Sequence, residues 1–240
     1  MTAAPLRLLL LSNSKNYGRV YLEHAEAAIK DFLGSGVQRL LFVPYAAVSV
    51  SQDDYAAAVG MRFGELGYGV ESVHRQTDPV AAVARAQAIV VGGGNTFQLL
   101  KRLHDTGLLE AIRARVRSGV PYLGWSAGAN LAGPSIRTTN DMPIVQPPSF
   151  EALRLVPFQI NPHYTDQRIA NHGGESRAER LLEFITLNPG VPVVGLREGS
   201  LLRVEGGALE LLGAEPARVF VSGREPSEHP PGSSLQFLMP

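Results

Sequence analysis

Short apolar runs of strand length alternate with amphipathic stretches along most of the chain, and this alternation limits the fold more than any other feature. Continuous runs of Val, Leu and Ile are typical of strands that are buried on both faces. The pattern predicts repeated βα units, and hence an α/β fold with a mostly parallel sheet flanked by helices. The predicted strands span residues 7–11, 39–44, 70–74, 88–91, 120–124, 156–160, 191–196, 201–204 and 217–221.

Helical periodicity occupies several of the intervening stretches. Apolar residues recur at spacings of three and four over residues 21–32 and 108–116, which predicts two amphipathic helices. The sequence Ser-Arg-Ala-Glu at 176–179 has the form of a capping box and predicts the start of another. With 240 residues and no internal repeat, the chain is expected to form one domain over 1–223. Residues 224–240, rich in Pro, Ser and Gly, are expected to form a loose tail.

Composition excludes several classes of protein. The 22 Lys and Arg balance 22 Asp and Glu, so the electrostatic footprint of a nucleic-acid-binding protein is missing. The absence of cysteine rules out disulfides, thiolate metal sites and a cysteine nucleophile. No stretch approaches the roughly 20 apolar residues that cross a bilayer, and the start lacks the pattern of a signal peptide. A cytoplasmic protein that binds no membrane is expected.

A Gly-Trp-Ser-Ala-Gly segment at 124–128 lies between a predicted strand and a predicted helix. This is the context that a G-x-S-x-G nucleophile elbow requires, so Ser126 is the candidate nucleophile of a hydrolase. The backbone amide of Ala127, at the start of the helix, is a candidate donor to an oxyanion.

A second turn from strand to helix carries Gly-Gly-Gly-Asn at 92–95. It matches neither the dinucleotide fingerprint nor a P-loop. The amide of Gly93 or Gly94 is therefore the candidate for a second oxyanion donor, since loops at the carboxyl ends of neighbouring strands lie close together. Asn95 is a candidate helix N-cap, with Gln98 three residues later, and is also considered a candidate substrate-binding residue.

Ser126 needs a general base, and the chain has six histidines. His163 follows a predicted strand directly, where catalytic residues of open α/β sheets collect, and His172 is its rival. The carboxylate that orients the base could be Asp141, in the loop 138–143, or Glu198, just after the strand 191–196. Arg177 falls in the first turn of a helix, where a cation is disfavoured unless it faces an anionic ligand.

Together these residues resemble the peptidase E family of α-aspartyl dipeptidases. The matching segments, in the family's order, are LSNS (11–14), VGGGNTFQLL (91–100), GWSAGAN (124–130), IRTTNDMP (136–143), INPH (160–163) and GESR (174–177). The resemblance implies a cytoplasmic serine peptidase that cleaves small peptides, chiefly dipeptides, beginning with aspartate. It also implies a flavodoxin-like sheet akin to class I glutamine amidotransferases, with serine in place of their cysteine.

The resemblance assigns roles residue by residue. Ser126 matches the nucleophile, His163 the base, and Arg177 an arginine that receives the carboxylate of the substrate's aspartate. The third member of the triad corresponds to Asp141 or Glu198, and Glu198 is favoured because a residue just past a strand end is held more rigidly. No metal or organic cofactor is needed.

Several alternatives stay open. The loop 164–173 departs from the family's pattern, so the preferred peptide length and leaving residue are not fixed. The expected partners are small peptides with N-terminal aspartate, and a homodimer is one assembly that remains open. Rival functions are a cyanophycinase-like peptidase, another serine esterase, and a non-catalytic protein that binds an anion at residues 92–94.

Overall fold

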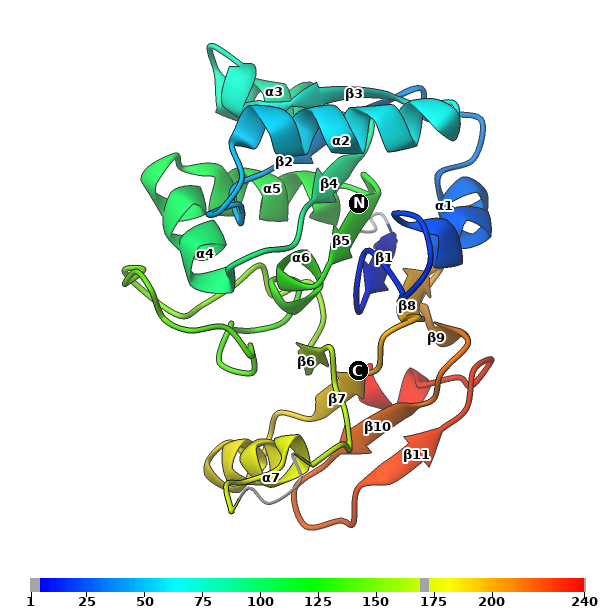
Figure 1. Cartoon of the computed structure of the whole chain (residues 1–240), viewed down its shortest axis with the longest axis vertical. Coiled ribbons are helices and arrows are strands. Elements are labelled where there is room, and N and C mark those ends of the chain that lie inside the picture. The colour runs from blue at the N-terminus through cyan, green and yellow to red at the C-terminus, as the bar shows by residue number, and fades with distance from the viewer. Residues whose placement is uncertain (1–4, 169–172, 240) are drawn as a thin grey trace.

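A seven-stranded sheet with helices on both faces forms the larger part of the structure, a computed structural model that describes residues 5–168 and 173–239 (Figure 1). Its strands are β1 (Leu8–Leu11), β2 (Arg39–Val43), β3 (Gly69–Ser72), β4 (Ile89–Val91), β5 (Tyr122–Trp125), β8 (Ser200–Glu205) and β9 (Ala208–Gly213). The first five are parallel, in the order β3-β2-β4-β5-β1, and β8 and β9 continue the sheet antiparallel beyond β1.

Helices cover both faces of this sheet. They are α1 (Glu26–Leu33), preceded by the short η1 (Glu23–Ala25), α2 (Gln52–Glu65), α3 (Pro79–Arg85), preceded by η2 (Val73–Arg75), α4 (Thr96–Asp105) and α5 (Leu108–Arg117). Leu9 and Leu11 of β1 pack in one apolar cluster with α1 and α2, whereas Leu8 and Leu10 pack in another with α3, α4 and α5. Successive side chains of a strand point to opposite faces, so this all-leucine strand is buried on both sides. Each leucine stabilises the fold by about 1.5–3 kcal/mol.

A second, four-stranded sheet contains β6 (Gln159–Pro162), β7 (Val193–Leu196), β10 (Ala217–Phe220) and β11 (Ser227–His229), in the order β11-β10-β7-β6. The helix α7 (Arg177–Leu187) packs against it through Leu181 and Ile185, which cluster with Val193 and Phe220 (Figure 1). The two sheets share a core, because one apolar cluster contains Leu10 and Leu202 of the first sheet and residues of β6, β7 and β10.

Side-chain caps begin several helices. The side chains of Ser51, Asp78, Asn95 and Ser176 accept hydrogen bonds from amides in the first turns of α2, α3, α4 and α7. The predicted N-cap at Asn95 is therefore confirmed, as is the capping box of Ser176 with Glu179. Among the helices of the described residues, none has the length and apolar character needed to cross a bilayer.

The predicted fold class is confirmed, and each predicted strand overlaps an observed one. The stretch 70–74 ends as a strand at Ser72 and turns into η2. The second half of the chain is less parallel than expected, because β8 to β11 all pair antiparallel with at least one neighbour. The predicted helix over 21–32 begins as η1 and becomes α-helical at Glu26.

The expectation of a loose tail over residues 224–240 is wrong for the part that the structure describes, which ends at residue 239. β11 pairs with β10, Ser234 forms a bridge with Glu210, and a 3-10 turn, η3, covers Gln236–Leu238. Leu235 and Leu238 belong to the main apolar cluster. Two separated leucines supply enough apolar area to hold a segment whose composition otherwise favours irregular structure.

Candidate active site

Ser126 occupies a sharp turn between β5 and the short helix α6 (Ala127–Asn130). Its backbone has φ 52° and ψ −113°, a conformation that costs a non-glycine residue about 1–3 kcal/mol. The turn is closed by glycines for steric reasons. A Cβ on Gly128 would lie 2.2 Å from the Val91 carbonyl oxygen, and one on Gly124 would lie 2.4 Å from the Gly128 oxygen. Larger residues at either position would push the elbow away from the sheet.

His163 lies in the turn directly after β6, also with a positive φ of 53°. Its Nε2 atom is 2.9 Å from Ser126 Oγ, and its Nδ1 atom is 2.7 Å from Glu198 Oε1. A carboxylate only accepts hydrogen bonds, so Nδ1 carries the proton that it donates to Glu198. In the neutral ring, Nε2 is then the acceptor for the Ser126 hydroxyl. The structure brings the candidate nucleophile, base and one carboxylate into a continuous chain of hydrogen bonds.

Ser12, at the end of β1, fixes the backbone of His163. Its hydroxyl donates to the Leu196 carbonyl at 2.7 Å and accepts from the His163 amide at 2.8 Å. Ser12 is fully buried. Ser12 lies in the matching segment LSNS but had no role assigned from the sequence, although a polar side chain directly after a buried strand is a signal that could have given it one.

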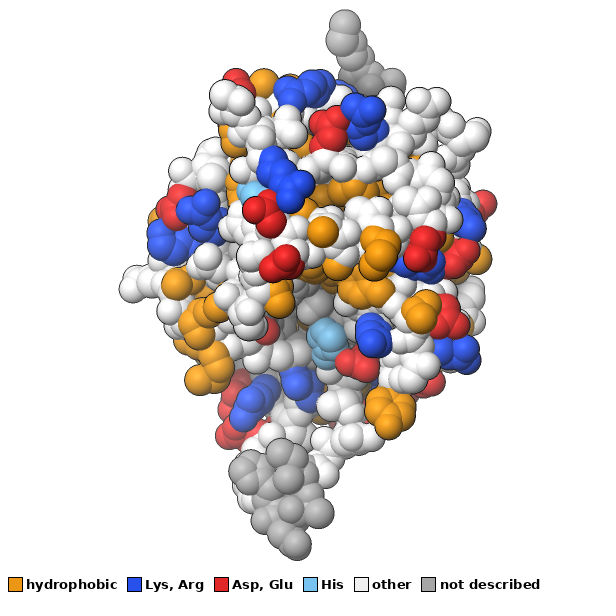
Figure 2. All heavy atoms as spheres, turned by 45° about the horizontal axis from the view of Figure 1, so that its top comes forward, with side chains coloured by type: hydrophobic (Ala, Val, Ile, Leu, Met, Phe, Trp, Pro, Cys, Tyr) orange, Lys and Arg blue, Asp and Glu red, His pale blue; other side chains and the backbone are white. Residues whose placement is uncertain are grey.

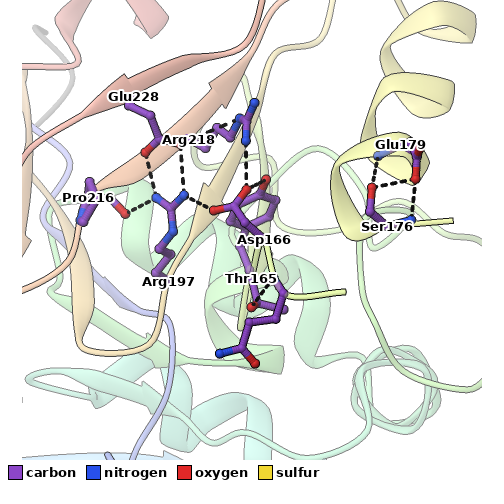
Figure 3. A network of polar contacts seen from close by, with 10 residues as sticks. Thr165, Asp166, Ser176, Glu179, Arg197, Pro216, Arg218 and Glu228 are labelled. Carbon is purple, nitrogen blue, oxygen red and sulfur yellow. Dashed lines mark hydrogen bonds and ion pairs between the residues drawn. The ribbon is translucent and has the colours of Figure 1, made fainter. Parts of the chain in front are cut away.

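An ionic network holds the chain shortly after His163, at Asp166, and directly before Glu198, at Arg197 (Figure 3). Arg197, the residue before Glu198, donates to Glu228 at 2.8 and 2.9 Å and also pairs with Asp166, three residues after His163. Arg218 donates to the same Asp166 at 2.8 Å. Hydrogen bonds from Arg197 to Glu228 and Asp166 raise the pKa of Arg197, so the guanidinium keeps its charge. The network ties the loop after β6 to the end of β7.

The His163–Glu198 pair faces solvent, with 40% of the histidine side chain and 54% of the glutamate side chain exposed. Figure 2 shows a hollow in one face of the molecule, with a histidine side chain at its wall and acidic and basic side chains beside it. Glu198 sits in a turn whose Gly199 amide donates to Asn13 Oδ1 at 2.9 Å. The buried Asn13 therefore fixes the backbone next to an otherwise accessible carboxylate.

Asp141, the other candidate carboxylate, lies at the start of α4. It accepts from the Thr96 amide at 2.7 Å, from the Thr96 hydroxyl at 2.6 Å and from the Thr139 hydroxyl at 3.1 Å. Both ring nitrogens of His163 are already bonded to Ser126 and Glu198. The structure thus places Glu198, and not Asp141, at the histidine. The rival histidine, His172, lies outside the described residues.

The glycine loop runs beside the elbow. A Cβ on Gly93 would lie 3.0 Å from Ser126 Cβ, which shows how closely the two backbones approach. The loop is anchored at both ends, since the Gly92 amide donates to Val43 at 3.1 Å and the Asn95 amide to Ala46 at 2.8 Å. Within the described residues, no hydrogen bond has the amide of Gly93, Gly94 or Ala127 as its donor. These candidate oxyanion donors are therefore available to a ligand.

Asn95 is engaged within the protein at both ends of its side chain. Its Oδ1 accepts from the Gln98 amide at 3.0 Å, and its Nδ2 donates to the Met142 carbonyl at 2.9 Å. These contacts connect the start of α4 to the loop that carries Asp141. They account for the asparagine without a substrate contact.

Arg177 is the first residue of α7 and is partly buried. It lines a cavity of about 430 Å³ together with Thr165, Gln167, Arg168, Gly174, Glu175, Ser176 and Arg180. Arg168 pairs with Glu179 and Arg180 with Glu175, but Arg177 makes no ion pair within the described residues. Burial, and then the nearby charge of Arg180, lowers the pKa of Arg177. An anion in this cavity would relieve both effects. Thr165 of the lining is only two residues after His163 in the chain, but neither His163 nor Ser126 lines the cavity.

Comparison with known proteins identifies the family of this chain. The model of peptidase family S51 matches residues 8–212. A Peptidase E from Streptomyces coelicolor is 54% identical over 235 residues, covering 98% of this chain and 95% of that protein. A Peptidase E from Nostoc sp. is 48% identical over 233 residues, covering 97% and 96%.

Solved structures share the fold at lower identity. A peptidase from an acI-B1 Actinobacterium superposes with a TM-score of 0.71 at 20% identity, covering 96% of each chain. A putative Peptidase E protein from Listeria monocytogenes EGD-e gives a TM-score of 0.65 at 22% identity, covering 88% of this chain and all of that one. The family match over most of the chain and the near full-length relatives lead to one conclusion: the chain belongs to peptidase family S51, and it is a hydrolase of peptide bonds.

Proposed function

We propose that this peptidase is a cytoplasmic serine dipeptidase that hydrolyses small peptides, mainly dipeptides, with an N-terminal aspartate. The observation that carries the proposal is the position of the His163 ring, 2.9 Å from Ser126 on one side and 2.7 Å from Glu198 on the other. A nucleophile, a base and a carboxylate that orients the base are the parts that acyl transfer through serine requires.

In the proposed reaction, His163 Nε2 removes the proton of the Ser126 hydroxyl as Oγ attacks the carbonyl carbon of the first residue. Glu198 stabilises the imidazolium that results and keeps the ring oriented. The protonated Nε2 then donates its proton to the leaving amine, and the second residue departs. A water molecule, deprotonated by the same ring, hydrolyses the aspartyl ester on Ser126 and releases aspartate.

The tetrahedral intermediate carries a negative charge on the former carbonyl oxygen. The amides of Ala127 and of Gly93 or Gly94 are proposed to bind it, because Ala127 directly follows Ser126, the glycine loop runs close beside Ser126, and these amides have no acceptor within the described residues. Each such donor typically lowers the barrier by roughly 3 kcal/mol. The strained backbone of Ser126 holds its side chain at the point where these two segments meet.

Arg177 is proposed to bind the side-chain carboxylate of the substrate's aspartate. Its guanidinium is partly buried and makes no ion pair within residues 5–168 and 173–239, and its planar group of donors matches a carboxylate. A peptide with a neutral first residue would leave this cation unpaired, at a cost of about 1–3 kcal/mol. Selection for aspartate would then follow because a substrate with a neutral first residue cannot form the ion pair with Arg177.

The test is a panel of Asp-Leu, Glu-Leu, Asn-Leu and Ala-Leu, with kcat/KM measured for each. Asp-Leu is expected to exceed Asn-Leu and Ala-Leu by at least about 10-fold, and up to 100-fold or more, because the buried guanidinium stays unpaired with the neutral residues. Equal rates for Asp-Leu and Ala-Leu would contradict the proposed specificity. Hydrolysis of simple esters with no cleavage of any dipeptide would point to an esterase instead.

A further inference from the structure

The glycine loop next to Ser126 has a third anchor between its two ends. This anchor is a side chain of α2, which packs on the same face of the seven-stranded sheet as α1. Tyr55, in the first turn of α2, has its hydroxyl 3.2 Å from the Gly93 carbonyl oxygen and 3.0 Å from Trp125 Nε1. Trp125 is the residue before the candidate nucleophile. One hydroxyl therefore connects the glycine loop with the strand that ends at Ser126.

The direction of both hydrogen bonds is fixed by chemistry. An indole N–H can only donate, so the Tyr55 oxygen is the acceptor from Trp125. The single hydrogen of the hydroxyl is then left for the Gly93 carbonyl. Burial raises the pKa of Tyr55, so the phenol remains protonated and able to donate. The ring is held by an edge-to-face contact with Phe42, with centroids 5.1 Å apart.

The Gly93 carbonyl shares a peptide plane with the amide of Gly94. In a trans peptide the C=O and the N–H point in opposite directions, and the structure has no cis peptide in its described residues. A hydrogen bond that fixes the carbonyl therefore also fixes where the Gly94 N–H points. This control matters because glycines on both sides of the bond leave the peptide free to rotate.

We propose that Tyr55 is a positioning residue that locks the Gly93–Gly94 peptide with its carbonyl toward the tyrosine and the Gly94 N–H toward the oxyanion. The inference rests on the proposed function, in that it takes Ser126 as the nucleophile. It selects Gly94 as the donor on this loop. Tyr55 touches no reacting atom and acts only through the peptide plane.

Loss of the Tyr55 hydroxyl would leave the Gly93–Gly94 peptide free to rotate. A rotated peptide would present the Gly93 carbonyl, instead of an N–H, to the developing negative charge. Binding of the substrate in its ground state does not depend on this charge, so the effect belongs to the chemical step. The predicted signature is a fall in kcat at nearly constant KM.

The experiment compares Tyr55→Phe with the wild type and with Tyr68→Phe. Tyr68 is a matched control, because its hydroxyl also donates to a glycine carbonyl, that of Gly34 at 3.4 Å, beyond the opposite end of α2. For each protein, kcat and KM on Asp-Leu are measured, together with inhibition by the aldehyde analogue of aspartate and by free aspartate. Thermal unfolding of each variant establishes that it is folded at the assay temperature.

For Tyr55→Phe, kcat is expected to fall about 10- to 100-fold, less than the 10²–10³ typical when an oxyanion donor is removed outright. The aldehyde, which forms a tetrahedral adduct with serine, should bind weaker by the same factor, whereas KM and inhibition by aspartate change less than about two-fold. Tyr68→Phe should match the wild type in all four measurements.

A kcat for Tyr55→Phe within two-fold of the wild type would overturn the proposal, as would an equal loss in Tyr68→Phe or a loss confined to KM. Failure of the proposed function gives a different result, because it appears in the wild type as poor hydrolysis of Asp-Leu. In that case Tyr55 is tested by the rate at which a fluorophosphonate labels Ser126, because the P=O group of this reagent also needs the oxyanion donors. Slower labelling in Tyr55→Phe than in the wild type and Tyr68→Phe would support the role of Tyr55, and equal labelling would overturn it. If Ser126 of the wild type were not labelled, both the proposed serine mechanism and the proposed role of Tyr55 would be overturned.

Discussion

His163 Nε2 lies 2.9 Å from Ser126 Oγ, although the two residues follow strands of different sheets. Ser126 follows β5 of the seven-stranded sheet, and His163 follows β6 of the four-stranded sheet. The hydrogen bond between them therefore spans the junction of the sheets. The contacts that hold this junction should affect catalysis as well as stability.

Ser12 is the contact at the junction that lies nearest to the histidine backbone. Ser12→Ala leaves the His163 amide without its buried acceptor, whereas the Leu196 carbonyl keeps its hydrogen bond from the Tyr164 amide. The expected cost is about 1–3 kcal/mol in the free energy of unfolding. We also expect kcat to fall about 10-fold, because the positive φ of His163 is no longer supported. Denaturant unfolding and kcat on Asp-Leu check both effects.

Ser200→Ala is the matched control for Ser12. Ser200 is equally buried, and its hydroxyl donates to the Glu215 carbonyl, away from the histidine. It should lose stability and keep its kcat. If both variants lost activity equally, the effect of Ser12 would be one of stability alone.

Replacing the carboxylate of Glu198 or of Asp141 by an amide should have clearly different effects on kcat. Glu198→Gln is expected to lower kcat by about 10³-fold or more, because an amide can donate to Nδ1 and favour the wrong tautomer of His163. Asp141→Asn should cost about 1 kcal/mol of stability at the start of α4, with kcat changed less than about 10-fold. The reverse order of the two kcat values would assign the orienting role to Asp141.

Arg177→Ala should remove the preference for aspartate. We expect the ratio of kcat/KM for Asp-Leu to kcat/KM for Asn-Leu to fall about 10- to 100-fold, because Asp-Leu loses its ion pair and Asn-Leu no longer leaves a cation unpaired. Arg180→Ala is the control, since Arg180 lines the same cavity and pairs with Glu175. An unchanged ratio of Asp-Leu to Asn-Leu in Arg177→Ala would show that another group reads the carboxylate.

His24 predicts how stability depends on pH. Neither ring nitrogen of His24 reaches solvent, and burial lowers the pKa of His24 from 6.5 despite the nearby charge of Glu198 and the contact with the Asn13 backbone. The unfolded chain then binds a proton at a higher pH than the folded one. The contribution of neutral His24 is fully present above about pH 6.5 and is lost as pH falls below it.

Denaturant unfolding at a series of pH values tests this sign. The free energy of unfolding of the wild type should drop more steeply below pH 6.5 than that of His24→Asn. Parallel curves for His24→Asn and the wild type would contradict the prediction.

Local sequence was sufficient where a residue type and its neighbours define a turn. The elbow at Ser126, the cap at Asn95 and the capping box at Ser176 are each set within a few residues, and each could be predicted. Its place just past a strand end favours Glu198 over Asp141, but this local feature does not show which carboxylate lies near His163. Only the packing of β6 beside β7 brings one of them to His163.

Long-range contacts explain the other differences. The edge strand β11, Ser227–His229, contains no apolar residue and so has no periodicity to recognise. The roles of Ser12 and Tyr55 could not be predicted, although Ser12 lies in the matching segment LSNS, since they depend on carbonyls far away in the sequence. Leu235 and Leu238 lie in the short run Leu-Gln-Phe-Leu-Met at 235–239, at the end of a segment otherwise rich in Pro, Ser and Gly, and their burial becomes apparent only once the sheets pack together.

The central claim is that Ser126 carries an acyl-enzyme, and mass spectrometry of the acid-quenched enzyme tests it most directly. After mixing with an activated aspartyl ester, the wild type should gain the mass of one aspartyl group on the peptide that contains Ser126. Ser126→Ala should gain none and should hydrolyse Asp-Leu at no more than a trace of the wild-type rate. An adduct on a different residue, or undiminished hydrolysis by Ser126→Ala, would contradict the account.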